Sequence, residues 1–485
     1  MTDIAQIVAN IDPEHGVFIG GAWQEANGGT FAVENPADQS VIAYISNGGV
    51  TEARNAVGAA AARLASWSST APRTRSDLLM KVRELMLRDA DELAALIAAE
   101  NGKSLGDARG EVVYAAEFFR WYAEEGVRPH GDFGTSPAGG VRTVVTSRPV
   151  GVAALATPWN FPAAMATRKM APALAAGCTV VLKPASETPL TALAIGKLVQ
   201  EAGVPDGVVN IVCGDRASEI VGAWMEDPQV KKISFTGSTA VGKVLLGQAA
   251  KRVLNASMEL GGCAPFLVTK DADIPAAVED AMIAKFRNGG QACTAANTFY
   301  VHADAADEFT QALMDKMTEL KVGPASEGSD IGPLINKRAL DGVSRLVEQA
   351  VAVGARVAYS STVESINGHF YPPTLLVDVP ADADVVREEI FGPVAPIVTW
   401  TNLETVLDSI NASELGLAGY VFAGDLGTGM RIAERLEIGM IGINRGIVSD
   451  PAAPFGGTKQ SGIGREGARA GLEEYLETQN FSIAW

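Results

Sequence analysis

The sequence predicts an α/β protein with a doubly wound, Rossmann-type parallel sheet and a second α/β region behind it. Between residues 150 and 250, short apolar runs alternate with amphipathic, helix-like segments through short connections, which is typical of βαβ units. A further α/β pattern runs from residue 259 to about residue 464. The chain has 485 residues, more than one small core holds, so two or three domains are expected.

The first 140 residues show three successive sequence patterns. Residues 17–47 have the pattern of short strands joined by glycine-rich turns. Residues 51–126 place apolar side chains at positions i, i+3 and i+4, which predicts amphipathic helices. Residues 129–140 are rich in glycine and proline and are predicted to form a linker.

The alternating region supplies four expected strands and four expected helices. The strands are expected at residues 150–158, 179–184, 207–214 and 231–238, and the helices at 163–177, 189–203, 217–227 and 239–250. Doubly wound sheets bind ligands at the carboxyl ends of their strands. The loops at those ends carry Asn160, Lys183, Ser186 and Gly237, so a dinucleotide is expected there.

The C-terminal tail predicts a helix at residues 468–477 and a strand at 480–485. An edge strand that carries aromatic side chains needs to be covered. We therefore interpret the tail, together with residues 141–149, as a subunit contact. The side chains that would share one face of the strand are Phe481, Ile483 and Trp485.

Charge and composition exclude several classes of function. Hydrophobic residues make up 47% of the chain and charged residues 20%, as in an ordinary globular protein, and the net charge of −18 argues against a nucleic-acid partner. The four cysteines form no CxxC pair, which fits a reducing cytoplasm. Neither a signal peptide nor a membrane span is expected. No metal site is expected because the histidines lie far apart: His15, His130, His302 and His369.

Three separated residues offer the groups needed to attack a carbonyl, stabilise an oxyanion and hydrolyse a thioester. Cys293 follows Gly-Gly-Gln in a loop expected to be flexible; the alternative is a small buried hydrophobic residue. Glu259 precedes Leu-Gly-Gly, where partial desolvation would raise its pKa toward that of a base; alone it could equally be a loop charge. Asn160 could donate its amide to an oxyanion or form a turn between prolines.

Two further segments suit a dinucleotide. Residues 235–243 have the pattern of a strand end, a glycine turn and a helix start, which lets backbone amides approach a phosphate. The turn is not a full GxGxxG, and many βα turns look like it. Lys183 and Ser186 follow the second strand, where an adenosine ribose would lie. They suit a 2′-phosphate, whereas a carboxylate such as that of Glu187 prefers the free hydroxyl.

These motifs together resemble those of the aldehyde dehydrogenase superfamily. TPWNFP, FTGST, ELGG, GQAC, EEIFGPV and PFGGTKQSGIGRE occur in the family's order and at its usual separations, from about Val17 to Phe481. The resemblance implies an aldehyde dehydrogenase-like fold. It assigns residues 1–128 and 150–258 to a dinucleotide-binding domain and 259–466 to a catalytic domain. Residues 129–149 and 467–485 then form a small β oligomerisation element.

The resemblance also implies roles for individual residues. Cys293 matches the nucleophile, Glu259 the base that activates the deacylating water, and Asn160 with the Cys293 backbone amide the oxyanion hole. Lys169 and Glu466 match residues in a proton path from the base. The implied cofactor contacts are Thr157, Trp159, Lys183, Ser186, Gly237, Ser238, Glu389 and Phe391, of which Glu389 would hold the nicotinamide ribose.

Within the superfamily the chain is most similar to the succinate-semialdehyde dehydrogenases. Arg168 and Arg287 match two arginines that hold a substrate carboxylate, and Ser449 matches a hydroxyl at the same group. Two guanidinium groups in one pocket favour an anion. Asp450-Pro451 after Ser449 is unusual for this branch and leaves the substrate's chain length open.

The similarity implies an NAD(P)-dependent enzyme of 4-aminobutyrate (GABA) degradation that forms a homodimer or homotetramer. Ser186, where NAD-preferring relatives often have Glu, favours NADP, with NAD as the alternative. Glutarate-semialdehyde dehydrogenase, another ω-carboxyl semialdehyde dehydrogenase and a general aldehyde dehydrogenase remain alternatives, since one methylene changes specificity by only ~1–3 kcal/mol. A CoA-acylating enzyme is disfavoured by Glu259, and a structural protein of this fold by the presence of both Cys293 and Glu259.

Overall fold

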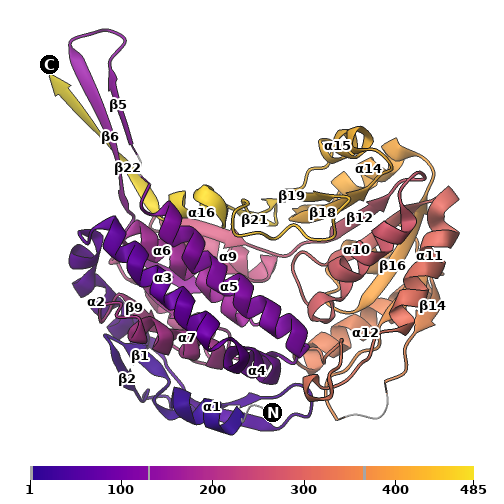
Figure 1. Ribbon diagram of the computed structural model, residues 1–485, viewed down its shortest axis with the longest axis horizontal. Coiled ribbons are helices and arrows are strands. Elements are labelled where there is room, and N and C mark those ends of the chain that lie inside the picture. The colour runs from indigo at the N-terminus through magenta and orange to yellow at the C-terminus, as the bar shows by residue number, and fades with distance from the viewer. Residues whose placement is uncertain (1–3, 129–130, 364–366, 485) are drawn as a thin grey trace.

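The structure, a computed structural model, describes residues 4–128, 131–363 and 367–484. Figure 1 shows two α/β bodies and a three-stranded sheet that projects away from the first of them. The predicted α/β fold class with parallel sheets is therefore confirmed. None of the helices in the described ranges combines the length and the apolar run needed to span a bilayer.

The first body is built on an eight-stranded sheet in the order β2-β1-β9-β8-β7-β10-β11-β21, whose central strands β9 to β11 are parallel. All four strands expected from the alternating pattern are present. The strands are β1 (Val17–Ile19), β2 (Ala22–Gln24), β7 (Val152–Ala156), β8 (Thr179–Lys183), β9 (Val209–Ile211), β10 (Val230–Thr236), β11 (Asn255–Glu259) and β21 (Gly462–Ile463).

Helices cover both faces of this sheet, because its strands are apolar on both sides. Within β7, Ala153 and Leu155 pack into one core with α3 to α7, whereas Val152 and Ala154 pack into another with α2, α8 and α9. The helices are α2 (Val50–Ser68), α3 (Pro72–Arg88), α4 (Ala90–Asn101), α5 (Leu105–Glu125), α6 (Pro162–Ala176), α7 (Leu190–Glu201), α8 (Ala217–Glu226) and α9 (Thr239–Ala250).

Short elements complete the N-terminal part of this body. The antiparallel pair β3 and β4 confirms the strands expected there, and α1 precedes them in the chain. Their bounds are α1 (Ile4–Ile11), η1 (Pro13–His15), β3 (Thr30–Glu34) and β4 (Val41–Ser46).

The second body is built on a seven-stranded sheet in the order β14-β15-β16-β13-β12-β18-β19, parallel except for the edge strand β14. Its strands are β12 (Ala264–Val268), β13 (Ala296–His302), β14 (Arg356–Ser360), β15 (Thr374–Val377), β16 (Val394–Trp400), β18 (Ala418–Phe422) and β19 (Met440–Ile443). Its helices are α10 (Ile274–Phe286), η2 (Arg287–Gly290), α11 (Ala303–Thr318), η3 (Ala325–Glu327), α12 (Lys337–Ala352), α13 (Asp384–Arg387), α14 (Leu403–Asn411) and α15 (Leu426–Ala433).

The chain then returns from the second body to the first. After the small ladder of β17 (Leu415–Gly416) with β20 (Thr458–Lys459), strand β21 pairs antiparallel with β11, placing Gly462 opposite Glu259. Segments about 200 residues apart in the sequence therefore lie side by side at Glu259.

The projecting sheet contradicts the predicted linker. Residues 131–135 form β5 (Gly131–Thr135), which pairs with β6 (Val141–Pro149). Gly139 and Gly140 have φ of 76° and 68°, so these breakers make the turn of a hairpin instead of an open connection. The β-branched residues of β6 favour a strand.

The tail also differs from its expected bounds. Helix α16 (Ala468–Glu473) is shorter than expected, and β22 (Leu476–Ala484) begins earlier and pairs antiparallel with β6 along its whole length. Phe481 and Ile483 are exposed, as a contact surface requires, while Trp485 lies outside the described residues. So does His130.

Candidate active site

A cavity of about 210 Å³ lies where the carboxyl ends of β7, β10 and β11 meet segments of the second body. It brings together seven of the residues that the sequence singled out: Trp159, Asn160, Gly237, Ser238, Cys293, Glu389 and Phe391. The lining residues are Pro158, Trp159, Asn160, Met165, Thr236, Gly237, Ser238, Leu260, Gly261, Cys293, Glu389 and Phe391.

Cys293 lies in this cavity just after η2. The loop before it was expected to be flexible, but it is a tightly bonded turn: Gln291 is 1% exposed and its side chain bonds to the backbone of Asn288, Pro333 and Ile335. Gly290 has φ of 78°, and a Cβ there would collide with the Gly392 carbonyl, so glycine is required. The thiol is thus held in one place.

The charges around the thiol are mixed. Burial raises the pKa of Cys293 to about 12. The guanidinium groups of Arg168 and Arg287 act in the opposite direction, whereas Glu389 and Glu259 add to the rise. The resting thiol is therefore protonated, and the two arginines are the groups that stabilise its thiolate.

Glu259 is the last residue of β11 and is 2% exposed. Its Oε2 has no hydrogen-bond partner among the described residues. Burial and the neighbouring Glu466 carboxylate raise its pKa well above the ordinary value, opposed by Lys169, Arg168 and Arg465. An unpartnered carboxylate oxygen with a raised pKa has the properties of a general base.

Lys169 lies on α6 and links that helix to the Glu466 carboxylate. Its Nζ lies 2.5 Å from Glu466 Oε1 and donates to Ser234 Oγ at 3.0 Å. Lys169 and Glu466 are therefore in contact, next to Glu259.

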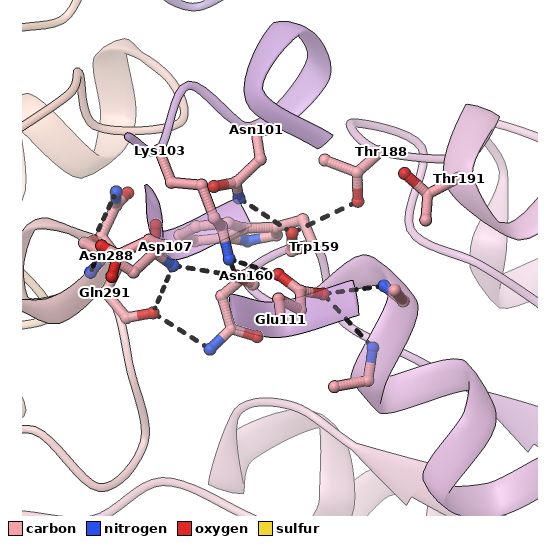
Figure 2. A network of polar contacts seen from close by, with 12 residues as sticks. Asn101, Lys103, Asp107, Glu111, Trp159, Asn160, Thr188, Thr191, Asn288 and Gln291 are labelled. Carbon is pink, nitrogen blue, oxygen red and sulfur yellow. Dashed lines mark hydrogen bonds and ion pairs between the residues drawn. The ribbon is translucent and has the colours of Figure 1, made fainter. Parts of the chain in front are cut away.

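Asn160 follows β7 and is 4% exposed. Its side-chain Nδ2 donates to the Gln291 carbonyl at 3.1 Å, which ties it to the loop of Cys293 (Figure 2). An amide nitrogen carries two hydrogens, so one N–H is left for an oxygen in the cavity.

The two arginines differ in their surroundings. Arg168 is 2% exposed; its Nη2 donates to Tyr114 Oη at 2.8 Å, and Nη1 lies 3.5 Å from Glu466 Oε2. The Arg168 Nε and Nη1 groups make no hydrogen bond within the described residues. Arg287 lies over the ring of Phe161, 5.3 Å from its centroid. Arg168 is thus partly paired, with Tyr114 and Glu466.

Ser449 is half-buried in the stretch after β19. Its neighbour Val448 packs against the same apolar cluster as Cys293. The place of Ser449 at a substrate carboxylate stays a prediction.

The nicotinamide end of a dinucleotide fits the residues of the cavity. Burial raises the pKa of Glu389 to about 7, and its only hydrogen-bond partner among the described residues is the Gly262 N–H, at 3.3 Å. Such a carboxylate can accept hydroxyl groups of a ribose. Trp159 and Phe391 lie edge to face with centroids 5.5 Å apart, and a Cβ on Gly237 would collide with Phe235.

The residues expected at the adenosine end lie at the end of β8. Lys183 is buried and donates to the Pro184 carbonyl at 2.8 Å; burial lowers its pKa. Ser186 Oγ donates to Glu187 Oε2 at 3.1 Å. The Thr157 amide donates to the Lys183 carbonyl at 3.2 Å, which joins this end to β7.

The sequence did not indicate several residues that shape the site. Lys103, Glu111 and Tyr114 reach it from the segment before and along α5, and Asn288 from η2. The helical pattern of α5 marks its apolar face but not which polar residues turn inward. Cys263 lines a separate cavity of about 460 Å³ and contacts the Arg387 carbonyl.

The fold and the cavity define an α/β protein in which the carboxyl ends of parallel strands face a half-buried thiol. The chain belongs to the aldehyde dehydrogenase family, and residues 23–481 match the model of the "Aldehyde dehydrogenase family". The resemblance found in the motifs is confirmed, and the enzyme class is that of an NAD(P)-dependent aldehyde dehydrogenase.

Three similar proteins carry more specific descriptions. A succinate-semialdehyde dehydrogenase of Paenarthrobacter nicotinovorans is 48% identical, over 92% of this chain and 99% of its own. A glutarate-semialdehyde dehydrogenase of Pseudomonas putida is 46% identical, over 96% and 97%. The crystal structure of an E. coli NADP-dependent enzyme is 44% identical and covers 98% of this chain and 99% of its own, with a TM-score of 0.96.

Proposed function

We propose that the protein oxidises succinate semialdehyde, or a close ω-carboxyl aldehyde such as glutarate semialdehyde, to the dicarboxylate. The observation that carries this proposal is Arg168, a buried guanidinium beside Cys293 with two N–H-bearing nitrogens that lack hydrogen bonds to the described residues. A carboxylate of the substrate would satisfy them. The names of two similar proteins, which act on four- and five-carbon semialdehydes, support the same substrate class.

In the proposed reaction, Arg168, Arg287 and Ser449 hold the carboxylate and place the carbonyl at Cys293. The thiol gives its proton to water, and the thiolate sulfur attacks the carbonyl carbon, so that the C=O π pair moves onto the oxygen. Asn160 Nδ2 and the Cys293 N–H donate to the developing alkoxide, an arrangement that typically contributes on the order of 10²–10³ in rate.

Glu389, Phe391, Trp159, Gly237 and Ser238 would hold the nicotinamide half of the cofactor. When bound, the cofactor would accept the aldehydic hydrogen as hydride while the alkoxide re-forms its C=O bond, which would leave a thioester on Cys293. The thioester on Cys293 is then hydrolysed by water. Glu259 takes a proton from that water, and Lys169 and Glu466 are placed to pass it on.

A first prediction concerns Arg287. In Arg287→Met, kcat/KM for succinate semialdehyde is expected to fall about 10- to 100-fold, because a charge-assisted pair is worth about 1.5–3 kcal/mol. The value for butanal, an uncharged aldehyde of equal length, should change little. Initial rates with both substrates test this, and Arg120→Met, an exposed arginine of α5, is the control. Equal use of the two aldehydes by the unaltered enzyme would mean a general aldehyde dehydrogenase.

We propose NADP as the preferred cofactor, with Ser186 and Lys183 at the 2′-phosphate. The description of the similar E. coli structure as NADP-dependent supports this preference. Glu187 is the opposing group, since its carboxylate accepts from Ser186 and would have to turn away from a phosphate.

A second prediction follows for Ser186. Ser186→Glu is expected to raise KM for NADP by about tenfold or more through like-charge repulsion, while KM for NAD stays within about twofold. Ser186→Gln is the control, because glutamine has the size of glutamate but no charge, and it should raise KM for NADP much less. An unaltered NADP-to-NAD ratio in Ser186→Glu would contradict the assignment.

We propose that the three parts of the fold have the roles that the family resemblance implies. Residues 1–128 and 150–258 bind the dinucleotide, and 259–466 carry the nucleophile. The strands of 129–149 and 467–485 form the contact of a homodimer or homotetramer in the cytoplasm. The exposed Phe133, Phe481 and Ile483 of the projecting sheet support that contact.

A further inference from the structure

A fully buried ion pair lies directly behind Asn160. Lys103, which follows α4, donates from Nζ to Glu111 Oε2 at 2.5 Å and to the Asn160 carbonyl at 2.7 Å. Neither charged side chain has any solvent exposure. The ammonium also lies 3.9 Å from the ring centroid of Phe161. Figure 2 shows Lys103 between Glu111 and the backbone of Asn160.

Glu111 anchors this pair to the start of α6. Its Oε1 accepts from the N–H groups of Ala163 and Ala164, at 2.8 and 3.2 Å. The N-cap residue of α6, Phe161, offers no side-chain cap, so Glu111 satisfies donors that the helix cannot. A carboxylate at a helix N-terminus is also favoured by the helix dipole. Glu111 is therefore fixed in position, and it fixes Lys103.

The Asn160 carbonyl receives a second donor from the nucleophile's loop. Asn288 Nδ2 donates to it at 2.8 Å and to the Gln291 carbonyl at 3.1 Å, and Asn160 Nδ2 donates to that same Gln291 carbonyl. Asn288 has φ of 53°, and its N–H donates to Asp107 Oδ2 at 2.7 Å. The backbone and side chain of Asn160 are thus bonded to the segment that ends in Cys293.

Stability alone does not account for the pair. A buried ion pair is often no more stabilising than apolar residues of the same volume. The charged groups that act most on the Cys293 thiol are Arg168, Glu389, Glu259 and Arg287. Besides its ion pair with Glu111 and its contact with Phe161, Lys103 holds one carbonyl, and that carbonyl belongs to the proposed oxyanion donor.

We propose that Lys103, held by Glu111, is a positioning residue for the oxyanion amide. It fixes the Asn160 carbonyl, and thereby aims the free Asn160 N–H at the carbonyl oxygen of the substrate beside Cys293. This inference rests on the proposed function, in which Asn160 stabilises the alkoxide.

The test is the pre-steady-state burst of reduced cofactor, which reports acylation. Lys103→Met keeps the length and apolar stem but removes the donor. We expect the burst rate to fall about tenfold to a hundredfold, short of the full loss of an oxyanion donor, with KM for the aldehyde within about twofold. If Lys103→Met folds poorly, the double variant Lys103→Met, Glu111→Gln takes its place in the test. It removes the Glu111 charge that the single variant leaves unpaired, and the amide oxygen can still accept from the N–H groups at the start of α6.

A double-mutant cycle with Asn160→Ala separates positioning from general damage. If Lys103 acts through the Asn160 amide, Lys103→Met should slow the burst by less than about twofold in the Asn160→Ala background. Lys232→Met removes another buried, ion-paired lysine, from β10, and should leave the burst rate unchanged.

An unchanged burst in Lys103→Met, or an equal loss in both backgrounds, would overturn the positioning role. Asn160→Ala with a normal burst would instead overturn the proposed role of Asn160, and the Lys103 proposal with it.

Discussion

Replacing Cys293 with alanine is expected to abolish aldehyde oxidation. The described lining of the cavity then contains no thiol to form the thioester, and loss of a nucleophile typically costs about 10⁴-fold or more in kcat. Steady-state formation of reduced cofactor and of the carboxylic acid measures the effect. Cofactor binding should persist, because Glu389, Trp159 and Phe391 are unchanged.

Cys263→Ala is the matched control for this prediction. Cys263 is also half-buried, and burial likewise raises the pKa of its thiol to about 12, but it lines a different cavity. We expect its replacement to leave turnover within about twofold. Full activity in Cys293→Ala, or loss of activity in Cys263→Ala alone, would show that Cys293 is not the nucleophile.

Replacing Glu259 with glutamine is expected to separate the two halves of the reaction. The isosteric amide cannot take a proton from water, so acylation should proceed as a burst of about one equivalent of reduced cofactor per site while thioester hydrolysis slows about 10²–10⁴-fold. Rapid-mixing kinetics and mass spectrometry of the acylated protein measure both steps. Glu100→Gln is the control: Glu100 is equally buried but bonds to the start of α7.

The pH dependence of thioester hydrolysis, compared between the unaltered enzyme and Glu259→Gln, gives an independent check. Glu259 must be ionised to act as a base, and burial beside Glu466 raises its pKa above the ordinary value of 4.5. Hydrolysis is therefore slow at low pH, where Glu259 is protonated, and increases as the pH rises through that raised pKa. This limb should vanish in Glu259→Gln. A burst as slow as the steady state would contradict the assignment of Glu259 to deacylation.

The sequence predicted the parallel sheet well, because strands and their connections depend on local patterns. Apolar runs gave β7 to β10 nearly at their true bounds, and glycine and proline marked their ends. The sequence-based prediction failed at residues 129–140, where glycine and proline were interpreted as signs of a linker. Gly139 and Gly140 lie in a hairpin turn, and β6 pairs on its other side with β22, more than 300 residues later in the chain, a partner that no local pattern indicates.

The sequence by itself determined the chemical groups of this protein: a thiol, a carboxylate, an amide and two arginines in motifs whose order identifies the family. Only the tertiary structure decided how those groups are used. Burial beside Glu466 raises the pKa of Glu259, Arg168 is partly paired, and Lys103 reaches the Asn160 carbonyl. These properties depend on distances between residues far apart in the chain and on removal from water, neither of which a local pattern encodes.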